Sequence, residues 1–287
     1  MRVVGGMILR NGIKLDYPFR EAILSALPLC ERFYVSVGQS EDGTREAVLS
    51  LGSPKLVLLD STWDLSLRKG GMLLAVETNK LLDWLPPADW VLILQADEVL
   101  HEADYTAIEA AMVRWKEDPK VEGLVFDYLH FYGSYEWVGA SRRWYRREVR
   151  IIRSDPTIRA YKDAQGFRRK GRKLQVKPSG GRIFHYGWVR PPEAQLRKFA
   201  EMERLWHSDD WLARHQPQRF VYHTTDVLKR YEGTHPQVMT ERLAVPRSWH
   251  FEYNPAEAKQ TLRERLLHWI ERRTGWRPWE FRNYRLI

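Results

Sequence analysis

The chain has 287 residues, which is enough to bury a hydrophobic core without disulfides or a structural metal. Hydrophobic residues make up 44% and charged residues 29% of the chain, so a disordered protein is excluded. The 46 Lys and Arg against 37 Asp and Glu give a net charge of +9. This charge suits an anionic partner: a phosphorylated small molecule, a nucleic acid or an acidic membrane surface.

The sequence also limits the cellular compartment. Cys30 is the one cysteine, which excludes an internal disulfide and a zinc ribbon. The longest apolar runs, such as residues 90–94, are far shorter than the roughly 20 residues of a membrane span. The N-terminus lacks the features of a signal peptide. We therefore expect a cytoplasmic protein and leave open a peripheral contact with the inner face of the membrane.

Strand-like and helix-like segments alternate over the first 130 residues. The patterns predict strands at residues 3–9, 32–37, 55–59 and 89–95, and helices at residues 18–27, 43–51, 66–85 and 105–116. Such alternation favours parallel strand pairing and an α/β sheet covered by helices on both faces.

The pattern changes beyond residue 121, where a longer strand is predicted at residues 121–131 and helices are predicted after Pro191. The residues from Asn254 to Glu257 are typical of a helix start, and this helix is predicted to end at Gly275. Its apolar stripe predicts packing on its own domain, with docking on an anionic membrane left open as the alternative. The stripe consists of Leu262, Leu266, Trp269 and Ile270.

Ligands of open α/β sheets bind beyond the carboxyl ends of the strands, so the residues there are candidates for a site. Arg10 and Asn11 follow the first predicted strand, and an arginine there can reach a phosphate. Ser40 to Thr44 follow the second strand and open a helix whose free amides can meet an anion.

Two acids, Asp97 and Glu98, follow the most apolar predicted strand and come directly after Gln95 and Ala96. Carboxylates at such a place are costly unless they are solvated, paired or bound to a metal. Oxygen ligands suit Mg²⁺ or Mn²⁺, which also bind the oxygens of a substrate diphosphate. The acids therefore indicate a divalent metal site, with capping of the next helix as the alternative.

Over about residues 3–190 the chain resembles the nucleotide-sugar glycosyltransferases of the GT-A fold, especially family 2. The family carries an Asp-x-Asp metal motif at the fourth strand, where Asp97 fills the last position and Gln95 replaces the first acid. The resemblance further rests on the Ser-x-Asp-Gly-Thr turn at residues 40–44 and on the ordered run of Asp163, Arg168, Gly171, Pro178 and His185.

The resemblance implies a GT-A (Rossmann-like) α/β fold with a mixed, mainly parallel sheet flanked by helices and a helical C-terminal extension. Residues 1–190 would form the nucleotide-sugar-binding and catalytic domain. Residues 191–287 would form a helical region rich in basic and aromatic residues.

The resemblance also implies a function: inverting, metal-dependent transfer of a sugar from a nucleoside-diphosphate-sugar donor. The acceptor would be a saccharide or a lipid-linked molecule, as in the synthesis of cell-envelope polysaccharide. Asp163 would be the catalytic base, and Asp97, Glu98 and His185 would hold Mn²⁺ or Mg²⁺. The residues expected to bind the donor are Arg10, Asn11, Ser40, Asp42, Lys69, Gln95 and Asp97.

Two other functions stay open. A sugar-phosphate nucleotidyltransferase would need a glycine-rich phosphate loop, whereas Gly5 and Gly6 lie inside the first predicted strand. A basic nucleic-acid-binding protein would explain the basic, aromatic residues 137–153 and 166–177. The acids at Asp97 and Glu98 are more typical of an enzyme cleft, so we expect no nucleic acid as a partner. A dinucleotide oxidoreductase is excluded because no GxGxxG motif follows the first strand.

Overall fold

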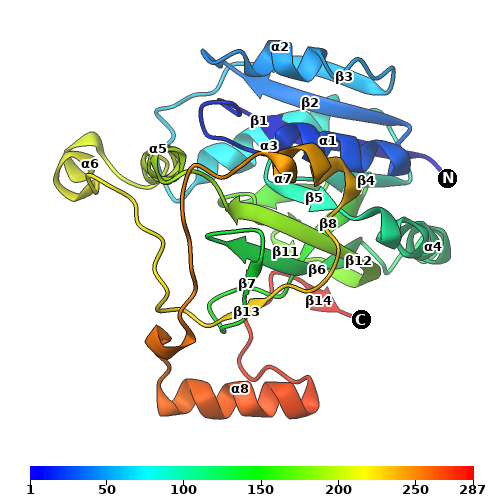
Figure 1. Cartoon of the computed structure of the whole chain (residues 1–287). Helices are drawn as coiled ribbons and strands as arrows, with labels where there is room; N and C mark the ends of the chain where they lie inside the picture. Colours follow the sequence, from blue (N-terminus) through cyan, green and yellow to red (C-terminus); the bar gives the residue numbers. More distant parts are fainter.

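An eleven-stranded mixed sheet forms the centre of the computed structural model, which describes residues 1–287 (Figure 1). A second, three-stranded sheet lies beside it. The strands of the large sheet are β1 (Val3–Leu9), β2 (Arg32–Gly38), β3 (Leu56–Ser61), β4 (Trp90–Ile93), β5 (Glu98–Leu100), β6 (Gly123–Tyr132), β7 (Trp137–Gly139), β8 (Arg147–Arg153), β12 (Gln175–Trp188), β13 (Leu228–Arg230) and β14 (Arg285–Leu286). The small sheet consists of β9 (Ile158–Tyr161), β10 (Gly166–Arg169) and β11 (Arg172–Lys173).

The order of the strands confirms the expected fold class. The main path runs β13-β7-β6-β8-β4-β1-β2-β3. Strands β1 to β4 are parallel to one another, and β8 is antiparallel to both of its neighbours, β4 and β6. Strand β12 runs parallel to β6 and antiparallel to the short β5. This is the mixed, mainly parallel sheet that the GT-A resemblance implied.

Helices cover the sheet and continue beyond it. The α-helices are α1 (Phe19–Ala26), α2 (Thr44–Leu49), α3 (Met72–Trp84), α4 (Tyr105–Trp115), α5 (Pro192–Glu203), α6 (Asp209–His215), α7 (Thr240–Ala244) and α8 (Leu262–Thr274). Short 3₁₀ turns lie at Leu27–Leu29, Glu102–Asp104, Gln237–Met239 and Pro255–Glu257. No helix is both long enough and apolar enough to cross a bilayer.

The alternation of side chains along β1 divides the core between the two faces of the sheet. Val3 and Met7 join the larger apolar cluster, which also holds residues of α1 and α4. Val4 joins the smaller cluster on the other face, together with residues of α3. Gly5 allows the close packing of β1, because a Cβ there would lie 2.3 Å from the Phe33 ring. The glycines of β1 are therefore packing residues of a buried strand.

Two predicted helix starts are wrong. The helix expected from residue 66 begins at Met72, because Gly70 and Gly71 have φ angles of 62° and 69°, outside the helical region. The C-terminal helix begins at Leu262, because Thr261 and Glu264 form a reciprocal capping box. The cap at Asn254 starts only a single 3₁₀ turn.

The expected packing of the C-terminal helix on its domain is also wrong. No residue of α8 is buried, and Leu262 is 83% exposed. In Figure 1, α8 lies at the edge of the molecule, apart from the sheet. Polar contacts, and not its apolar stripe, attach the helix to the rest of the chain.

Candidate functional site

A cavity of about 770 Å³ opens at the carboxyl ends of β1 and β4, where ligands of such sheets bind. Helices α3 and α5, the end of β12 and the residues after α5 complete its walls. The structure brings five of the residues predicted from the sequence to this cavity: Arg10, Gln95, Asp97, Asp163 and His185. Helix α5 lines the cavity although it lies beyond residue 190, and the predicted division of the chain at residue 190 stays a prediction.

Asp97 is the buried carboxylate at the centre of the site, with 5% of its surface exposed. Lys198 Nζ donates a hydrogen bond of 2.9 Å to Asp97 Oδ2 and one of 3.0 Å to the Gly187 carbonyl. Arg190 Nη2 lies 3.8 Å from the same carboxylate oxygen. Burial opposes ionisation of Asp97, but these cations, Lys198 foremost, hold its pKa well below the usual range. The carboxylate is therefore charged at neutral pH.

Burial and Asp97 also affect the pKa of Lys198, and here burial has the larger effect. Burial lowers the pKa of its ammonium to about 8, although Asp97 acts in the other direction. The group remains mostly charged near neutral pH, and it lines the cavity. Lys198 can therefore place a positive charge against an anionic ligand.

A pair of histidines lies beside Asp97. Burial lowers the pKa of His130 to about 3 and that of His185 to about 4, so both rings are neutral at neutral pH. His130 Nε2 lies 2.8 Å from the Tyr145 carbonyl, which can only accept, so this nitrogen carries the proton. His130 Nδ1 then accepts from His185 Nδ1 at 2.9 Å. The free lone pair of His185 is consequently on Nε2, which faces Asp97 Oδ1 at 3.7 Å.

These two donor atoms meet part of the requirement for a divalent cation. Asp97 Oδ1 and His185 Nε2 are suitable ligands, and the bond from His185 to His130 is the second-shell contact that orients such a histidine. No group of three or more His, Cys, Asp or Glu gathers anywhere in the chain in a way that could hold a metal. The residues therefore fit a Mg²⁺ or Mn²⁺ ion that takes its remaining ligands from a diphosphate. They do not form a complete cage of protein ligands.

Gly187 makes this arrangement sterically possible. A Cβ at this position would lie 2.5 Å from His185 Nε2 and 2.9 Å from Asp97 Oδ2. The Gly187 carbonyl also accepts from Lys198 and Arg190. Any larger side chain would displace the groups that face the cavity.

Glu98 does not line the cavity. Its side chain is fully buried and accepts from Arg150 Nε at 2.6 Å and Nη2 at 2.7 Å. Tyr128 Oη donates to it at 2.8 Å, and the Gln95 backbone amide donates at 3.0 Å. The bonds to both oxygens indicate a structural carboxylate behind the site, although the sequence suggested a metal ligand.

Asp163 lies in the turn between β9 and β10 and faces the cavity. Its Oδ1 accepts only from the Gln165 amide, at 3.4 Å, and it forms no ion pair. Arg168, a natural partner by sequence, instead donates to Asn283. Asp163 packs against Gly71 at the start of α3, where a Cβ would lie 2.8 Å from the Asp163 Cβ. The structure therefore leaves this carboxylate available to a ligand.

The remaining predicted donor residues lie outside the cavity lining. Ser40 Oγ accepts from the Asn11 amide at 3.0 Å, and Asp42 accepts from the Lys14 amide at 2.7 Å. These bonds tie the loop after β1 to the turn after β2. Lys69 is exposed and does not reach the cavity, whereas its neighbour Arg68 does. Donor contacts of Asn11, Ser40, Asp42 and Lys69 stay predictions.

Arg10 lines the cavity, and its Nη1 lies 3.3 Å from Glu201 Oε2. Its Nε is buried without a hydrogen-bond partner. Sequence reasoning missed Glu201, Lys198, Arg190 and His130. The one local signal was the position of α5 directly after β12, where a basic helix residue can face the strand ends.

No protein-family model and no curated protein matches the chain. Among solved structures, a glucosyl-3-phosphoglycerate synthase from Mycobacterium tuberculosis, in complex with Mn²⁺, UDP and phosphoglyceric acid, is 12% identical with a TM-score of 0.31. The match covers 45% of this chain and 43% of that enzyme, so it spans less than half of either.

Two further solved structures are similar to the chain. A mannosyl-3-phosphoglycerate synthase from Rubrobacter xylanophilus is 19% identical over 45% of this chain and 41% of that one, with a TM-score of 0.32. Residues 1–349 of TarS from S. aureus are 13% identical over 70% of this chain and 65% of that one, with a TM-score of 0.35. The fold class of this chain rests on its own strand order, described above.

The contacts of Glu98 predict a loss of stability on substitution. Glu98→Gln would leave Arg150 buried without its counter-ion, so we expect the free energy of unfolding to fall by about 3–5 kcal/mol in urea denaturation. Asp127→Asn is the control, because its pair with Arg147 is at the surface and its loss should cost less than about 1 kcal/mol. Equal unfolding midpoints for Glu98→Gln and the wild type would disprove the structural role.

Proposed function

We propose that the protein is a glycosyltransferase that moves a sugar from a nucleoside-diphosphate-sugar donor to a hydroxyl of a saccharide or lipid-linked acceptor, with inversion. One observation supports this most strongly. The cavity at the carboxyl ends of β1 and β4 is lined by the ionised Asp97, by His185 with the lone pair of its Nε2 facing Asp97, and by several cations. The carboxylate of Asp163, which forms no ion pair, also lines it. Such a set matches the needs of glycosyl transfer, namely stabilisation of a departing diphosphate and removal of a proton.

The diphosphate end of the donor requires positive charge. Lys198, Arg10 and Arg68 line the cavity and can face the phosphate oxygens. A divalent ion held by Asp97 and His185 would add Lewis-acid stabilisation of the leaving diphosphate. Trp63 and Trp188 also line the cavity and offer aromatic surface to a nucleobase or a sugar ring.

The acceptor end requires a base. In the proposed reaction the acceptor oxygen attacks the anomeric carbon while the bond from that carbon to the diphosphate oxygen breaks. Asp163 takes the proton of the acceptor hydroxyl. Its position in the cavity and its lack of an ion-pair partner support this role.

The arginines that suggested a nucleic-acid interface are used within the fold. Arg146 pairs with Glu280, Arg150 with Glu98, and Arg147 with Asp127. In the second basic stretch, both Arg169 and Arg172 pair with Glu122. These guanidinium groups do not form the free, continuous basic groove that tracks a nucleic-acid backbone, which favours the enzyme.

The metal ligand assignment predicts that Asp97→Asn abolishes the part of nucleotide binding that depends on a divalent ion. We expect UDP or GDP to bind at least about tenfold more weakly in the variant with Mn²⁺ present, measured by titration calorimetry. Asp210→Asn, at an exposed aspartate outside the cavity, is the matched control. Unchanged affinity in Asp97→Asn, together with no effect of EDTA on the wild type, would contradict the assignment.

The base assignment predicts that Asp163→Asn binds the donor nucleotide normally but turns over about 100-fold more slowly or worse, because the amide cannot take a proton. Release of the nucleoside diphosphate from UDP- and GDP-sugars in the presence of acceptor measures this. A variant with wild-type turnover would show that another group is the base.

The orientation of His185 by His130 predicts a metal effect without a change in the ligands themselves. His130→Phe removes the acceptor of the His185 Nδ1 proton, and we expect Mn²⁺ affinity in the presence of nucleotide to fall by about 10–100-fold. His235→Phe replaces a partly buried histidine outside the cavity and serves as the control. If both variants bind Mn²⁺ as the wild type does, His185 is not a ligand.

A further inference from the structure

A second surface lies outside the cavity: α8 together with residues 275–281, which we call the C-terminal arm. Six of its large apolar side chains are exposed, with Leu262 at 83% and Trp279 at 81%, whereas Leu267 and Ile270 are half-buried. Contiguous exposed apolar surface of this kind marks an interaction site in soluble proteins. The exposed apolar residues are Leu262, Leu266, Trp269, Trp276, Trp279 and Phe281. None of them lines the cavity.

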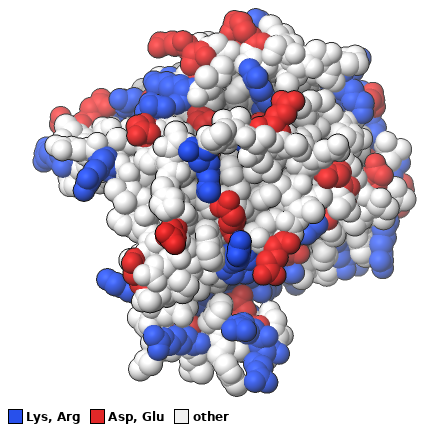
Figure 2. Space-filling view, in the orientation of Figure 1, with Lys and Arg blue, Asp and Glu red and all other residues white.

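Unpaired positive charge surrounds these apolar side chains. Four exposed arginines of α8 form no ion pair with a carboxylate: Arg263, Arg265, Arg272 and Arg273. Arg263 lies 5.9 Å from the ring centre of Trp279, and Arg273 lies 5.8 Å from that of Trp269. Figure 2 shows Lys and Arg on the protrusion at the bottom of the view, where α8 lies in Figure 1, with uncharged atoms between them.

The glutamates of the arm do not neutralise these exposed arginines. Glu264 caps the start of α8, while Glu271 and Glu280 bind arginines of the main body. The arm, residues 262–281, contains five arginines against three glutamates, a net side-chain charge of +2. The exposed charge of the arm is therefore positive.

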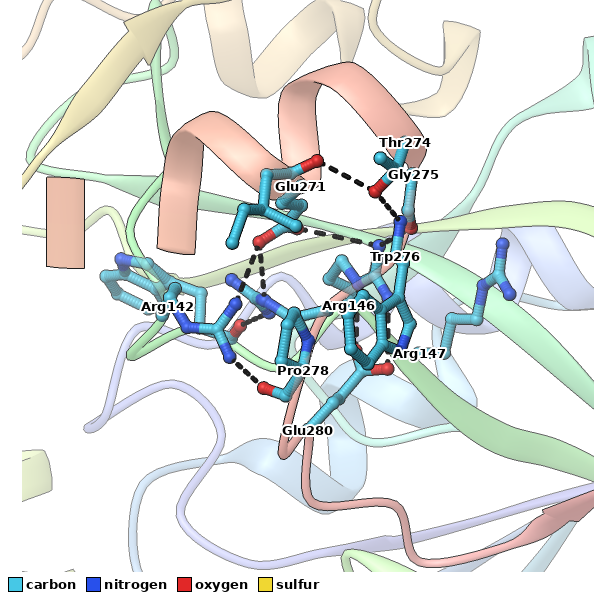
Figure 3. A network of polar contacts seen from close by, with 12 residues as sticks. Arg142, Arg146, Arg147, Glu271, Thr274, Gly275, Trp276, Pro278 and Glu280 are labelled. Atoms are coloured by element: carbon cyan, nitrogen blue, oxygen red, sulfur yellow. Dashed lines mark hydrogen bonds and ion pairs between the residues drawn. The ribbon is translucent and has the colours of Figure 1, made fainter. Parts of the chain in front are cut away.

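The arm is attached in one orientation by a polar network (Figure 3). Arg146 donates to Glu280 at 2.8 and 3.0 Å, and Arg142 Nη1 donates to Glu271 at 3.3 Å. Arg277 Nε donates to Glu271 at 3.0 Å, and its Nη1 donates to the Trp144 carbonyl at 2.8 Å. These contacts connect α8 and the residues after it to the segment before β8. The apolar residues are thus held exposed by the fold.

We propose that the C-terminal arm docks the protein on the surface of an anionic lipid bilayer. Leu262, Leu266 and Trp269 follow one face of α8 at spacings of four and three residues, as in helices that lie in the membrane interface. Indole rings favour the headgroup level, and arginines are attracted to anionic lipids. A second copy of the chain is a poorer occupant, because two arms would bring like charges together.

The test is co-sedimentation of the full chain with vesicles. One vesicle contains phosphatidylglycerol and phosphatidylcholine in equal amounts, and the other contains phosphatidylcholine alone. We expect at least about tenfold tighter binding to the anionic vesicle, since each arginine near such a surface contributes roughly fivefold. High salt should weaken this binding, because it screens exposed charges.

Matched variants assign the binding to the arm. Trp276→Ser with Trp279→Ser should weaken vesicle binding about tenfold or more, whereas Trp84→Ser, at an exposed tryptophan at the end of α3, should not. The double variant Arg272→Glu and Arg273→Glu should do the same. Its control, Arg20→Glu with Lys120→Glu, changes two exposed residues elsewhere and shifts the net charge equally. Thermal unfolding confirms that each variant is folded.

Several results would overturn the proposal. Equal binding to both vesicles would do so, as would arm variants that bind like their controls. Dimerisation of the wild type that is lost in the arm variants, without vesicle binding, would identify a second copy as the occupant. Binding of a single-stranded oligonucleotide through the same arginines, again without vesicle binding, would identify a nucleic acid. None of these results depends on glycosyltransferase activity, so the proposed function is tested separately.

Discussion

The charge of one buried carboxylate, Asp97, determines how the site is built. Burial alone would favour its neutral form, so the fold must bring cations to the end of β4. Lys198 lies in α5, and Arg190 lies just before α5. Both supply positive charge to Asp97, although they are about a hundred positions further along the chain. The resulting cluster leaves Asp97 Oδ1 facing the lone pair of His185. The electrostatics of the cavity thus depend on the docking of α5 against the sheet.

The two adjacent acids after β4 have different tasks because consecutive side chains diverge. Asp97 faces the cavity, whereas Glu98 points into the core and binds Arg150 and Tyr128. The buried ion pair of Glu98 and Arg150 joins β5 to β8 and so fixes the part of the sheet next to Asp97. Pre-organised binding of a charged ligand requires such a rigid support for the residues of the site.

The sequence contained most of the fold and part of the site. The bounds of β1, predicted at residues 3–9, agree with the structure. Placing polar residues at strand ends predicted Arg10 and Asp97, the family resemblance added Asp163, and all three line one cavity. The sequence analysis did not predict the roles of Lys198 and His130, because these roles come from contacts between distant segments. The start of α8 was predictable, since Thr261 and Glu264 have the spacing of a capping box. The assignment of the His185 lone pair to Nε2 depends on the contacts of both histidines, which only the structure provides.

In the proposed function, the cavity binds a nucleoside diphosphate together with a divalent ion. Thermal unfolding of the full chain with UDP or GDP, each with and without Mn²⁺, tests this most directly, because a ligand of the native state raises the midpoint by mass action. We expect one nucleotide to raise the unfolding temperature and Mn²⁺ to increase the rise. No rise with either nucleotide at millimolar concentration, with Mn²⁺ or with Mg²⁺, would contradict the proposed function.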